Sequence, residues 1–430
     1  MHRGASGVAE SFARALGSDR SIAITAYDGS RAGPSHAPAT VHIGSPRALQ
    51  RMASAPGELG LGRAVVAGDI IIDGDIYAVL AMREGARTGT ITDRWRAGVD
   101  LLRDAGLGAP PWRAPPSPPE EADLRGRRHS KRRDAEAISH HYDVSNDFYR
   151  LVLGESMTYS CAVWPSPDIS LDTAQDAKHE LICRKLGLTA DQRLLDVGCG
   201  WGSMLIHAAR HHGVRGVGVT LSSRQTELAR RRVAQAGISD RVEIRQADYR
   251  DVDDGPYDAI SSIGMFEHIG AAHLDEYFGR LHSLLRPGSR LLNHGITTPA
   301  RSTPVGRVRF RLSFVGRYVF PDGELHEVGK VVSRTQASGL EVRHVESLRE
   351  HYALTLRQWV TNLEAHWDEA VELVGARRAR VWRLFMAGSA LGFENGRLSV
   401  HQTLAVRPTG RPSELPLRPD WDVGSLDSRP

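Results

Sequence analysis

The segment LLDVGCGWG, residues 194–202, constrains the fold of this chain more than any other stretch. An apolar strand ends near Asp196, and Gly198, Gly200 and Gly202 then lead into the helical sequence MLIHAARHH. Glycines let the backbone turn sharply and approach a ligand closely, and the start of the following helix favours a negatively charged group. The dinucleotide-binding pattern GxGxxG would need a glycine at position 203, where Ser203 stands. The segment therefore predicts a ligand-binding turn between a strand and a helix that is not the dinucleotide-binding type.

Apolar strands alternate with helical stretches from about residue 134 to 406, which predicts an α/β fold with a largely parallel sheet and helices on both faces. The expected strands are 193–198, 216–220, 242–248, 258–264, 289–296, 341–347 and 399–406. Residues 1–106 predict a separate small α+β domain, with a helix at 5–16 and apolar runs punctuated by Asp-Gly pairs that favour hairpin turns. Residues 407–430 are rich in proline and polar residues, which predicts a flexible tail.

Composition excludes several classes of protein. Of the 430 residues, 41% are hydrophobic and 25% are charged, which is unlike collagen, a coiled coil or a disordered chain. Only four of the 55 basic residues are lysine. Three cysteines make no disulfide framework, and no stretch reaches the roughly 18 apolar residues of a membrane span, so we expect a cytoplasmic protein. There is no HExxH motif and no Asp-rich calcium loop, so we expect no metal site.

A proline-rich and basic linker, residues 107–133, joins the two predicted domains. Its end, RGRRHSKRR (125–133), is either a solvated linker or a contact with phosphate groups. Because no aromatic residues interleave with the basic ones, we expect an anionic membrane surface rather than nucleic acid as the partner. A peripheral association with the inner face of the membrane follows from this expectation.

The D-x-G-x-G-x-G form of the turn is typical of class I S-adenosylmethionine (SAM) methyltransferases. In such folds the second strand often ends in an acidic residue that binds ribose, but here Thr220 stands there, so Thr220, Ser222 or Gln225 is expected to take that role. The third strand ends at Asp248-Tyr249, which are expected to bracket an adenine, and the alternative for Asp248 is a helix cap.

Six segments in the right order resemble the cyclopropane-fatty-acyl-phospholipid synthase family: residues 140–164, 194–202, 218–225, 248–251, 264–270 and 316–325. The resemblance covers residues 134–406. The family includes the actinobacterial methyltransferases that make 10-methyl, tuberculostearic-type fatty acids. It implies that SAM, the co-substrate, is bound by Tyr159, Ser160, Asp196, Gly198, Gly200, Thr220, Leu221, Gln225, Asp248 and Tyr249.

The resemblance also implies a bound bicarbonate ion beside the reacting carbon, held by Cys161, Glu267, His294, Ile296 and Tyr352. One departure is Gly295, where relatives commonly carry threonine. Simpler roles stay open for three of these residues: Glu267 as a carboxylate at a helix N-terminus, Cys161 as a small buried hydrophobe and His294 as a core histidine.

The implied chemistry passes through a carbocation, which needs aromatic faces, exclusion of water and a base. Tyr142, Phe266 and Tyr352 are candidates for the aromatic role, and an aromatic insertion at 297–333 either shapes an acyl channel or packs as a lid. We expect a 10-methylene product, which a separate reductase would convert to a 10-methyl chain, or alternatively a cyclopropane. A small-molecule methyltransferase and an inactive lipid-binding protein are the rival functions, and a homodimer is one possible assembly.

Overall fold

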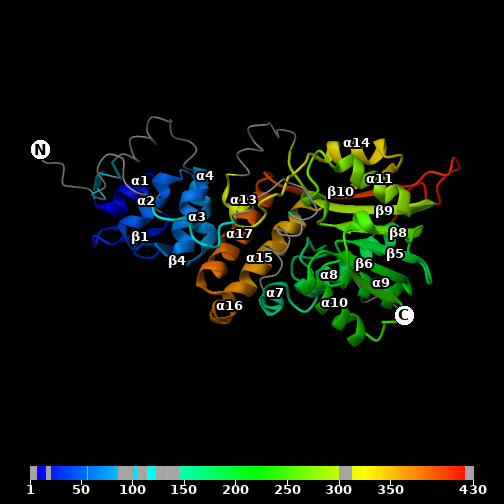
Figure 1. The fold of residues 1–430 in the computed structure, drawn as a ribbon. Coiled ribbons are helices and arrows are strands. Elements are labelled where there is room, and N and C mark those ends of the chain that lie inside the picture. Colours follow the sequence, from blue (N-terminus) through cyan, green and yellow to red (C-terminus); the bar gives the residue numbers. More distant parts are fainter. Residues whose placement is uncertain are drawn as a thin grey trace, which may run out of the picture. The chain divides into compact units, whose positions relative to one another are not determined.

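The computed structural model describes residues 7–15, 21–55, 57–85, 100–101, 103–104, 106, 114–122, 133, 145–299 and 312–421. The chain divides into two compact units (Figure 1). The first unit comprises residues 1–122, 312–319 and 367–391, and the second comprises residues 123–311, 320–366 and 392–430. The sequence predicted a continuous second domain over 134–406, and the structure differs because two segments within that range fold with the first unit.

The second unit contains a seven-stranded sheet in the order β10-β11-β9-β8-β5-β6-β7. Its strands are β5 (Arg193–Val197), β6 (Arg215–Thr220), β7 (Val242–Gln246), β8 (Tyr257–Ile263), β9 (Leu285–Thr297), β10 (Glu341–Ser347) and β11 (Ser399–Val406). Strands β5 to β9 pair in parallel, whereas β11 lies antiparallel between β9 and β10. All seven predicted strands are present, and the α/β class is confirmed.

Helices cover both faces of this sheet because the strands are apolar on both sides. Leu194 and Leu292 point into a core cluster with α8 (Leu171–Leu186), α9 (Ser203–His212) and α10 (Ser223–Gln235). Their neighbours Leu195 and Leu291 point into a second cluster with α11 (Leu274–Leu284) and α14 (Val328–Ala337). Successive side chains of a strand face opposite sides, so each Leu-Leu pair serves both cores. Among the described residues of this unit, two more α-helices are α7 (Asn146–Leu153) and α15 (Arg349–Ala365).

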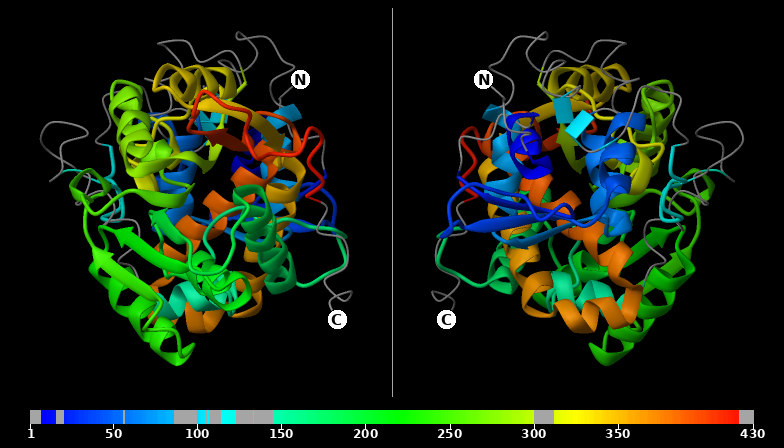
Figure 2. Two further views of the ribbon diagram at one scale, coloured as in Figure 1. Left: turned by 90° about the vertical axis from the view of Figure 1, so that its right-hand side faces the viewer. Right: turned by 90° about the vertical axis from the view of Figure 1, so that its left-hand side faces the viewer.

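The first unit is built on a four-stranded sheet in the order β2-β1-β3-β4. Its elements are α1 (Val8–Ala15), β1 (Ala23–Ala26), β2 (Arg31–Ala32), β3 (Ala39–Ile43), α2 (Pro46–Ser54), α3 (Glu58–Ala67), β4 (Ile70–Gly74), α4 (Ile76–Gly85), α13 (Phe314–Tyr318), α16 (Trp367–Val374) and most of α17 (Ala376–Glu394). The right-hand view of Figure 2 faces this unit, with its strands and early helices in blue.

The predicted helix at 5–16 and the hairpin turn at Asp28-Gly29 are both present, the latter between β1 and β2. The later apolar run, residues 63–84, does not form a hairpin at its Asp-Gly pair, because it contributes the end of α3, then β4 and α4. Later segments complete this unit: Phe314 lies against Gly62, and Arg383 donates hydrogen bonds to the carbonyl groups of Ile72 and Gly74. These long-range contacts explain why the unit is discontinuous in sequence.

Part of the predicted flexible tail is packed. Leu415 is buried in the core of the second unit, and the Trp421 ring meets His344 edge-on at a centroid distance of 4.6 Å. Residues 422–430 lie outside the described residues. Among the helices that the structure describes, none is long and apolar enough to cross a membrane.

Candidate active site

The glycine-rich turn after β5 has the backbone that its sequence predicts. Gly198, Gly200 and Gly202 have φ angles of 78°, 54° and 82°, in the left-handed region that favours glycine. The amides of Gly198 and Cys199 donate to the carbonyl of Val219 at 2.9 and 3.0 Å, which ties the turn to β6. The turn lies at the carboxyl edge of the parallel sheet, where ligands of open α/β folds bind.

One pocket at this edge contains all ten residues predicted to bind the co-substrate. They are Tyr159, Ser160, Asp196, Gly198, Gly200, Thr220, Leu221, Gln225, Asp248 and Tyr249. Further lining residues that the sequence did not suggest include Lys178, Trp201, Arg250 and Met265. The structure therefore brings together segments that lie up to 90 residues apart, and their role in binding stays a prediction.

Two polar pairs line the side of this pocket formed by β6 and β7. The Thr220 hydroxyl donates to Gln225 Oε1 at 2.7 Å, so the residues in place of the usual acid form a neutral pair. Arg250 donates to both carboxylate oxygens of Asp248, from Nε at 2.8 Å and from a terminal nitrogen at 2.6 Å. The Asp248 side chain also accepts the Arg250 N–H, as a cap does, so both readings of Asp248 agree with its position.

Lys178 is the most informative residue that sequence reasoning missed. It lies on α8 with 1% of its surface exposed, and its Nζ donates to the Ser160 hydroxyl at 3.3 Å. Burial lowers the pKa of Lys178 to about 7, although nearby Asp196 and Cys161 oppose this. Burial raises the pKa of Asp196 to about 6, against a hydrogen bond from Ser261 and the charge of Lys178. One signal was available, because lysine is rare in this chain.

Glu267 lies in the short 3₁₀ turn that follows β8, with its side chain buried. Its Oε1 accepts the backbone N–H of Ile296 at 2.6 Å. Its Oε2 is buried and has no hydrogen-bond partner among the described residues. Burial raises the pKa of Glu267 to about 7, which the hydrogen bond from Ile296 only partly offsets. The side chain reaches across to β9, although Glu267 also lies in the first turn of this 3₁₀ helix, so its simpler role stays open.

His294, on β9, is oriented by a chain of polar contacts. Lys185 Nζ contacts Glu346 and donates to Gln402 Oε1 at 2.7 Å. Because the amide oxygen of Gln402 accepts from the lysine, its Nε2 donates to His294 Nδ1, at 3.2 Å. Nδ1 is therefore the acceptor, and the proton of the neutral ring sits on Nε2. Burial lowers the pKa of His294 well below its ordinary value.

Cys161 and Tyr352 both contact the carbonyl of Leu348, whose own N–H donates to Val400 on β11. The Cys161 thiol is fully buried and contacts the carbonyls of Ala162 at 3.1 Å and Leu348 at 3.6 Å. Burial raises its pKa, so it is a neutral thiol. The Tyr352 ring packs against Phe393, with centroids 4.6 Å apart, and meets Trp359 edge-on at 6.0 Å. Tyr142 lies outside the described residues.

The five described residues of the predicted catalytic set do not line the co-substrate pocket themselves. Cys161 directly follows the lining residue Ser160, and Glu267 directly precedes the lining residue His268. Glu267 is joined to Ile296, which lies two residues beyond His294 on β9. Cys161 and Glu267 therefore adjoin the pocket, and Glu267 connects it to the end of β9.

The bicarbonate ion that the resemblance implies needs buried polar groups that can hold it. Both Glu267 Oε2 and His294 Nε2 are buried polar atoms for which the described part of the chain supplies no hydrogen-bond partner. Buried polar groups are normally paired, so such atoms fit a small polar guest. The Nε2–H of His294 is a donor suited to an anion. The residues present therefore fit the ion.

The glycine that departs from the family pattern has a structural explanation. A Cβ built on Gly295 would lie 1.7 Å from Cε1 of Phe266. Phe266 is fully buried and directly precedes Glu267. The absence of a side chain at position 295 therefore leaves room for the Phe266 ring beside the turn that carries Glu267.

The aromatic insertion does not line the pocket in its described part, residues 297–299 and 312–333. Phe314 and Tyr318 stack on one another, with centroids 4.9 Å apart, and belong to the first unit. Phe320 meets His268, which lines the pocket, at 5.7 Å. Packing thus explains Phe314 and Tyr318, whereas Phe310 lies outside the described residues.

The fold and the pocket together define a class I SAM-dependent methyltransferase. This chain is similar to a solved structure of the mycolic acid cyclopropane synthase CmaA1, complexed with S-adenosylhomocysteine (SAH) and CTAB. The two chains are 35% identical with a TM-score of 0.60, and the match covers 63% of this chain and 98% of that one. The match supports SAM as the co-substrate.

Sequence comparison then gives the family. The mycolic acid cyclopropane synthetase family matches residues 129–403, and the chain belongs to it. The probable fatty acid methyltransferase Rv3720 of Mycobacterium tuberculosis is 47% identical over 420 residues, which cover 93% of this chain and 94% of that protein. The tuberculostearic acid methyltransferase UfaA1 of the same organism is 34% identical, covering 86% of this chain and 83% of that protein.

Proposed function

We propose that this protein transfers a one-carbon unit from SAM to the cis double bond of an unsaturated, oleoyl-type phospholipid acyl chain. The product would be a 10-methylene chain, the precursor of a 10-methyl fatty acid. The observation that carries the catalytic part is Glu267, a buried carboxyl with a pKa of about 7 that adjoins the co-substrate pocket. A group that titrates near neutral pH is suited to accept or hold a proton.

The reaction begins when the alkene attacks the methyl group of the sulfonium. A carbon–carbon bond forms, the carbon–sulfur bond breaks, and SAH is released with the electron pair. The neighbouring acyl carbon becomes a cation, which the faces of Phe266 and Tyr352 would stabilise. A hydride shift to that carbon moves the charge to the methyl-bearing carbon, and loss of a proton from the methyl group gives the methylene. Direct loss of that proton would instead close a cyclopropane ring.

Both outcomes need one proton to be removed in a site without water. A bicarbonate ion held by Cys161, Glu267, His294, Ile296 and Tyr352 would supply that base. His294 offers a fixed Nε2–H, and Ile296 holds Glu267 in place through its N–H. Because Cys161 is a neutral thiol, it can donate a hydrogen bond but adds no negative charge beside the cation.

The methylene branch is supported by one relative that matches both units of the chain, the tuberculostearic acid methyltransferase. The two fatty acid methyltransferases cover 93% and 86% of the chain, whereas the solved cyclopropane synthase covers 63%. The first unit would then serve a substrate that the shorter enzymes do not take, such as a phospholipid. A separate reductase would be needed to reduce the methylene.

A phospholipid substrate requires contact with a membrane surface. Of the six basic residues in the linker end, Arg133 forms an ion pair with Asp322, with its Nε 2.6 Å from the carboxylate. The other five lie outside the described residues: Arg125, Arg127, Arg128, Lys131 and Arg132. They would supply the electrostatic attraction, which we expect to fall as salt is raised.

The test is to incubate the purified protein with dioleoyl phospholipid vesicles and SAM and to record proton NMR spectra of the released fatty methyl esters. Vinylidene protons would establish the methylene branch, and upfield ring protons would establish the cyclopropane alternative. Unchanged oleate, together with no vesicle binding at low or high salt, would overturn the proposal in favour of a small-molecule methyltransferase. Vesicle binding without turnover would favour an inactive lipid-binding protein.

A further inference from the structure

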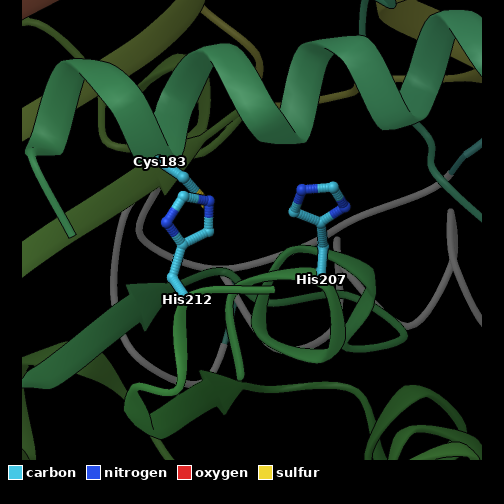
Figure 3. A group of neighbouring side chains, drawn as sticks. All are labelled: Cys183, His207 and His212. Atoms are coloured by element: carbon cyan, nitrogen blue, oxygen red, sulfur yellow. The ribbon is translucent and has the colours of Figure 1, made fainter. Parts of the chain in front are cut away.

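A cluster of metal-ligating side chains lies between α8 and α9, apart from the catalytic residues. Figure 3 shows Cys183 on α8 close to His207 and His212 on α9. One sulfur and two ring nitrogens of these residues lie within 4.8 Å of one another. Glu180, one turn before Cys183 on α8, places its Oε2 3.3 Å from His207 Nε2 and 3.1 Å from His212 Nε2.

The two distances from Glu180 are those of hydrogen bonds, and they also match the spacing of ligand atoms around a tetrahedral ion. Zinc binds histidine nitrogen and carboxylate oxygen at about 2.0–2.1 Å, so two such ligands in a tetrahedron lie about 3.3 Å apart. The carboxylate oxygen of Glu180 already stands at this distance from both imidazoles. A zinc–sulfur bond is about 2.3 Å long, and the Cys183 sulfur lies within 4.8 Å of a ring nitrogen of each histidine.

The surroundings suit a bound cation rather than a solvated surface. Cys183 is fully buried, and His207 and Glu180 are 8% and 3% exposed. The second oxygen of Glu180, Oε1, accepts a hydrogen bond from Arg184 at 2.9 Å, which fixes the orientation of the carboxylate. The Nδ1 atom of His207 faces Asp176 at 4.0 Å, on the side of the ring away from Glu180. Metal-binding histidines commonly direct their second nitrogen to a carboxylate in this way.

We propose that Cys183, His207 and His212, with Glu180 as the fourth ligand, form a structural zinc site that joins α8 to α9. The thiolate and the carboxylate together balance the two charges of the ion. All four tetrahedral positions are filled by protein, so the site is closed and takes no part in the chemistry. The linear sequence gave no sign of it, because its ligands sit at spacings of three and five residues on two separate helices.

The ion would stabilise the wall of the co-substrate pocket. Helix α9 begins at the glycine turn and carries the lining residues Ser203 and Met204, whereas α8 carries Lys178 and His179. Joining the two helices through the ion would hold these four residues in place. Zinc bound to the folded chain raises its stability as the free zinc concentration rises above the dissociation constant.

A second group, Asp176, His179 and His207, shares one histidine with this site. His179 is 2% exposed, and its Nε2 finds no hydrogen-bond partner in the part of the chain that the structure describes. It competes for His207 but contains no thiol. Cobalt therefore distinguishes the two, since only a thiolate ligand gives an intense sulfur-to-cobalt absorption in the near ultraviolet.

The experiment is to treat the full-length protein with a chelator, titrate it with Co²⁺ and follow the absorption spectrum, then displace the cobalt with Zn²⁺. We expect one equivalent to bind, with tetrahedral d–d bands and the sulfur charge-transfer band. Cys183→Ser should remove the charge-transfer band, and His212→Gln should weaken binding at least about tenfold. The matched controls are Cys199→Ser, a buried thiol elsewhere, and His211→Gln, an exposed neighbour on α9; both should keep the band.

Circular dichroism identifies any variant that does not fold. The proposal is overturned if the wild-type protein binds no equivalent of cobalt, or if cobalt binds without the sulfur band. It is equally overturned if His179→Gln abolishes binding while Cys183→Ser does not, because the ion would then occupy the second group. Zinc found by elemental analysis in protein purified without added metal would support the site independently of any activity.

Discussion

Glu267 Oε1 accepts the backbone N–H of Ile296 at 2.6 Å, which fixes a buried carboxyl between the ends of β8 and β9. One oxygen is thereby held in place, while the other has no partner among the residues described. Oε1 therefore positions the carboxyl, and Oε2 is the oxygen left to bind or release a proton.

Glu267→Gln keeps an acceptor for the Ile296 amide and removes the titrating group. We expect kcat to fall about 100-fold or more, because general acid–base groups contribute at least that much. SAH affinity, measured by calorimetry, should stay unchanged, since Glu267 does not line the pocket. The control is Glu227→Gln, an exposed glutamate on α10. Wild-type turnover in the Glu267→Gln protein would remove Glu267 from the mechanism.

The same substitution has a pH-dependent effect on stability. The pKa of Glu267 is about 7 in the folded chain against an ordinary value of about 4.5, so the unfolded chain loses this proton first. The stabilising contribution of the protonated group is therefore complete below about pH 4.5 and is lost as the pH rises through 7. We expect Glu267→Gln to gain about 2–3 kcal/mol relative to the wild type between pH 5 and pH 8. Urea unfolding at the two pH values measures this, and parallel changes in both proteins would contradict it.

Lys178→Met removes the cation beside Asp196 and the donor to Ser160. The pKa of Asp196 should rise further, so that its carboxyl is protonated at pH 7 and no longer attracts the cationic co-substrate. We expect SAM affinity to fall about tenfold at pH 7 and to recover toward pH 9. Lys330→Met, on α14, is the control. A loss that persists unchanged at pH 9 would show that Lys178 acts through packing rather than charge.

Gln402→Leu breaks the chain of contacts from Lys185 to His294. Without the amide donor, the His294 proton is free to move between its two nitrogens. We expect kcat to fall about tenfold with SAH affinity unchanged, and nitrogen NMR of His294 to change from a single Nε2–H form to a mixture. Gln336→Leu, on α14, should change neither. An unaltered tautomer would exclude Gln402 as the positioning residue.

Gly295→Ala should destabilise the protein by about 2–3 kcal/mol, because its Cβ would overlap the Phe266 ring. Gly295→Ala combined with Phe266→Leu should recover part of that loss, since leucine leaves room for the added carbon. Gly279→Ala is the control: that glycine lies in α11 with no heavy atom within 4 Å of the added Cβ, so the change should be neutral or stabilising. Urea unfolding tests all four proteins, and a stable Gly295→Ala single variant would contradict the packing argument.

Local sequence patterns predicted the parts of this protein that depend on a few neighbouring residues. The strands of the second unit are recognisable because their apolar runs must face a core on both sides, as Leu194 and Leu195 do. The glycine turn is recognisable because only glycine adopts its φ angles freely. The pocket residues follow from these two features, since parallel strands bring their carboxyl ends to one edge.

Tertiary structure alone decided the contacts between residues far apart in the chain. The pairing of Lys178 with Ser160 and the contact of Gln402 with His294 depend on how α8 and β11 pack, which no local pattern encodes. Phe314 joins the first unit although nearly 200 residues separate it from the end of that unit's initial segment.

The proposed zinc ligands show the same division. The sequence determines which side chains each helix carries and, through the helical period, which of them share a face. Whether Glu180 and Cys183 then meet His207 and His212 depends on the packing of α8 against α9. Burial also sets the proton affinities of Glu267 and Lys178, because desolvation depends on the whole surrounding fold and not on the residue itself.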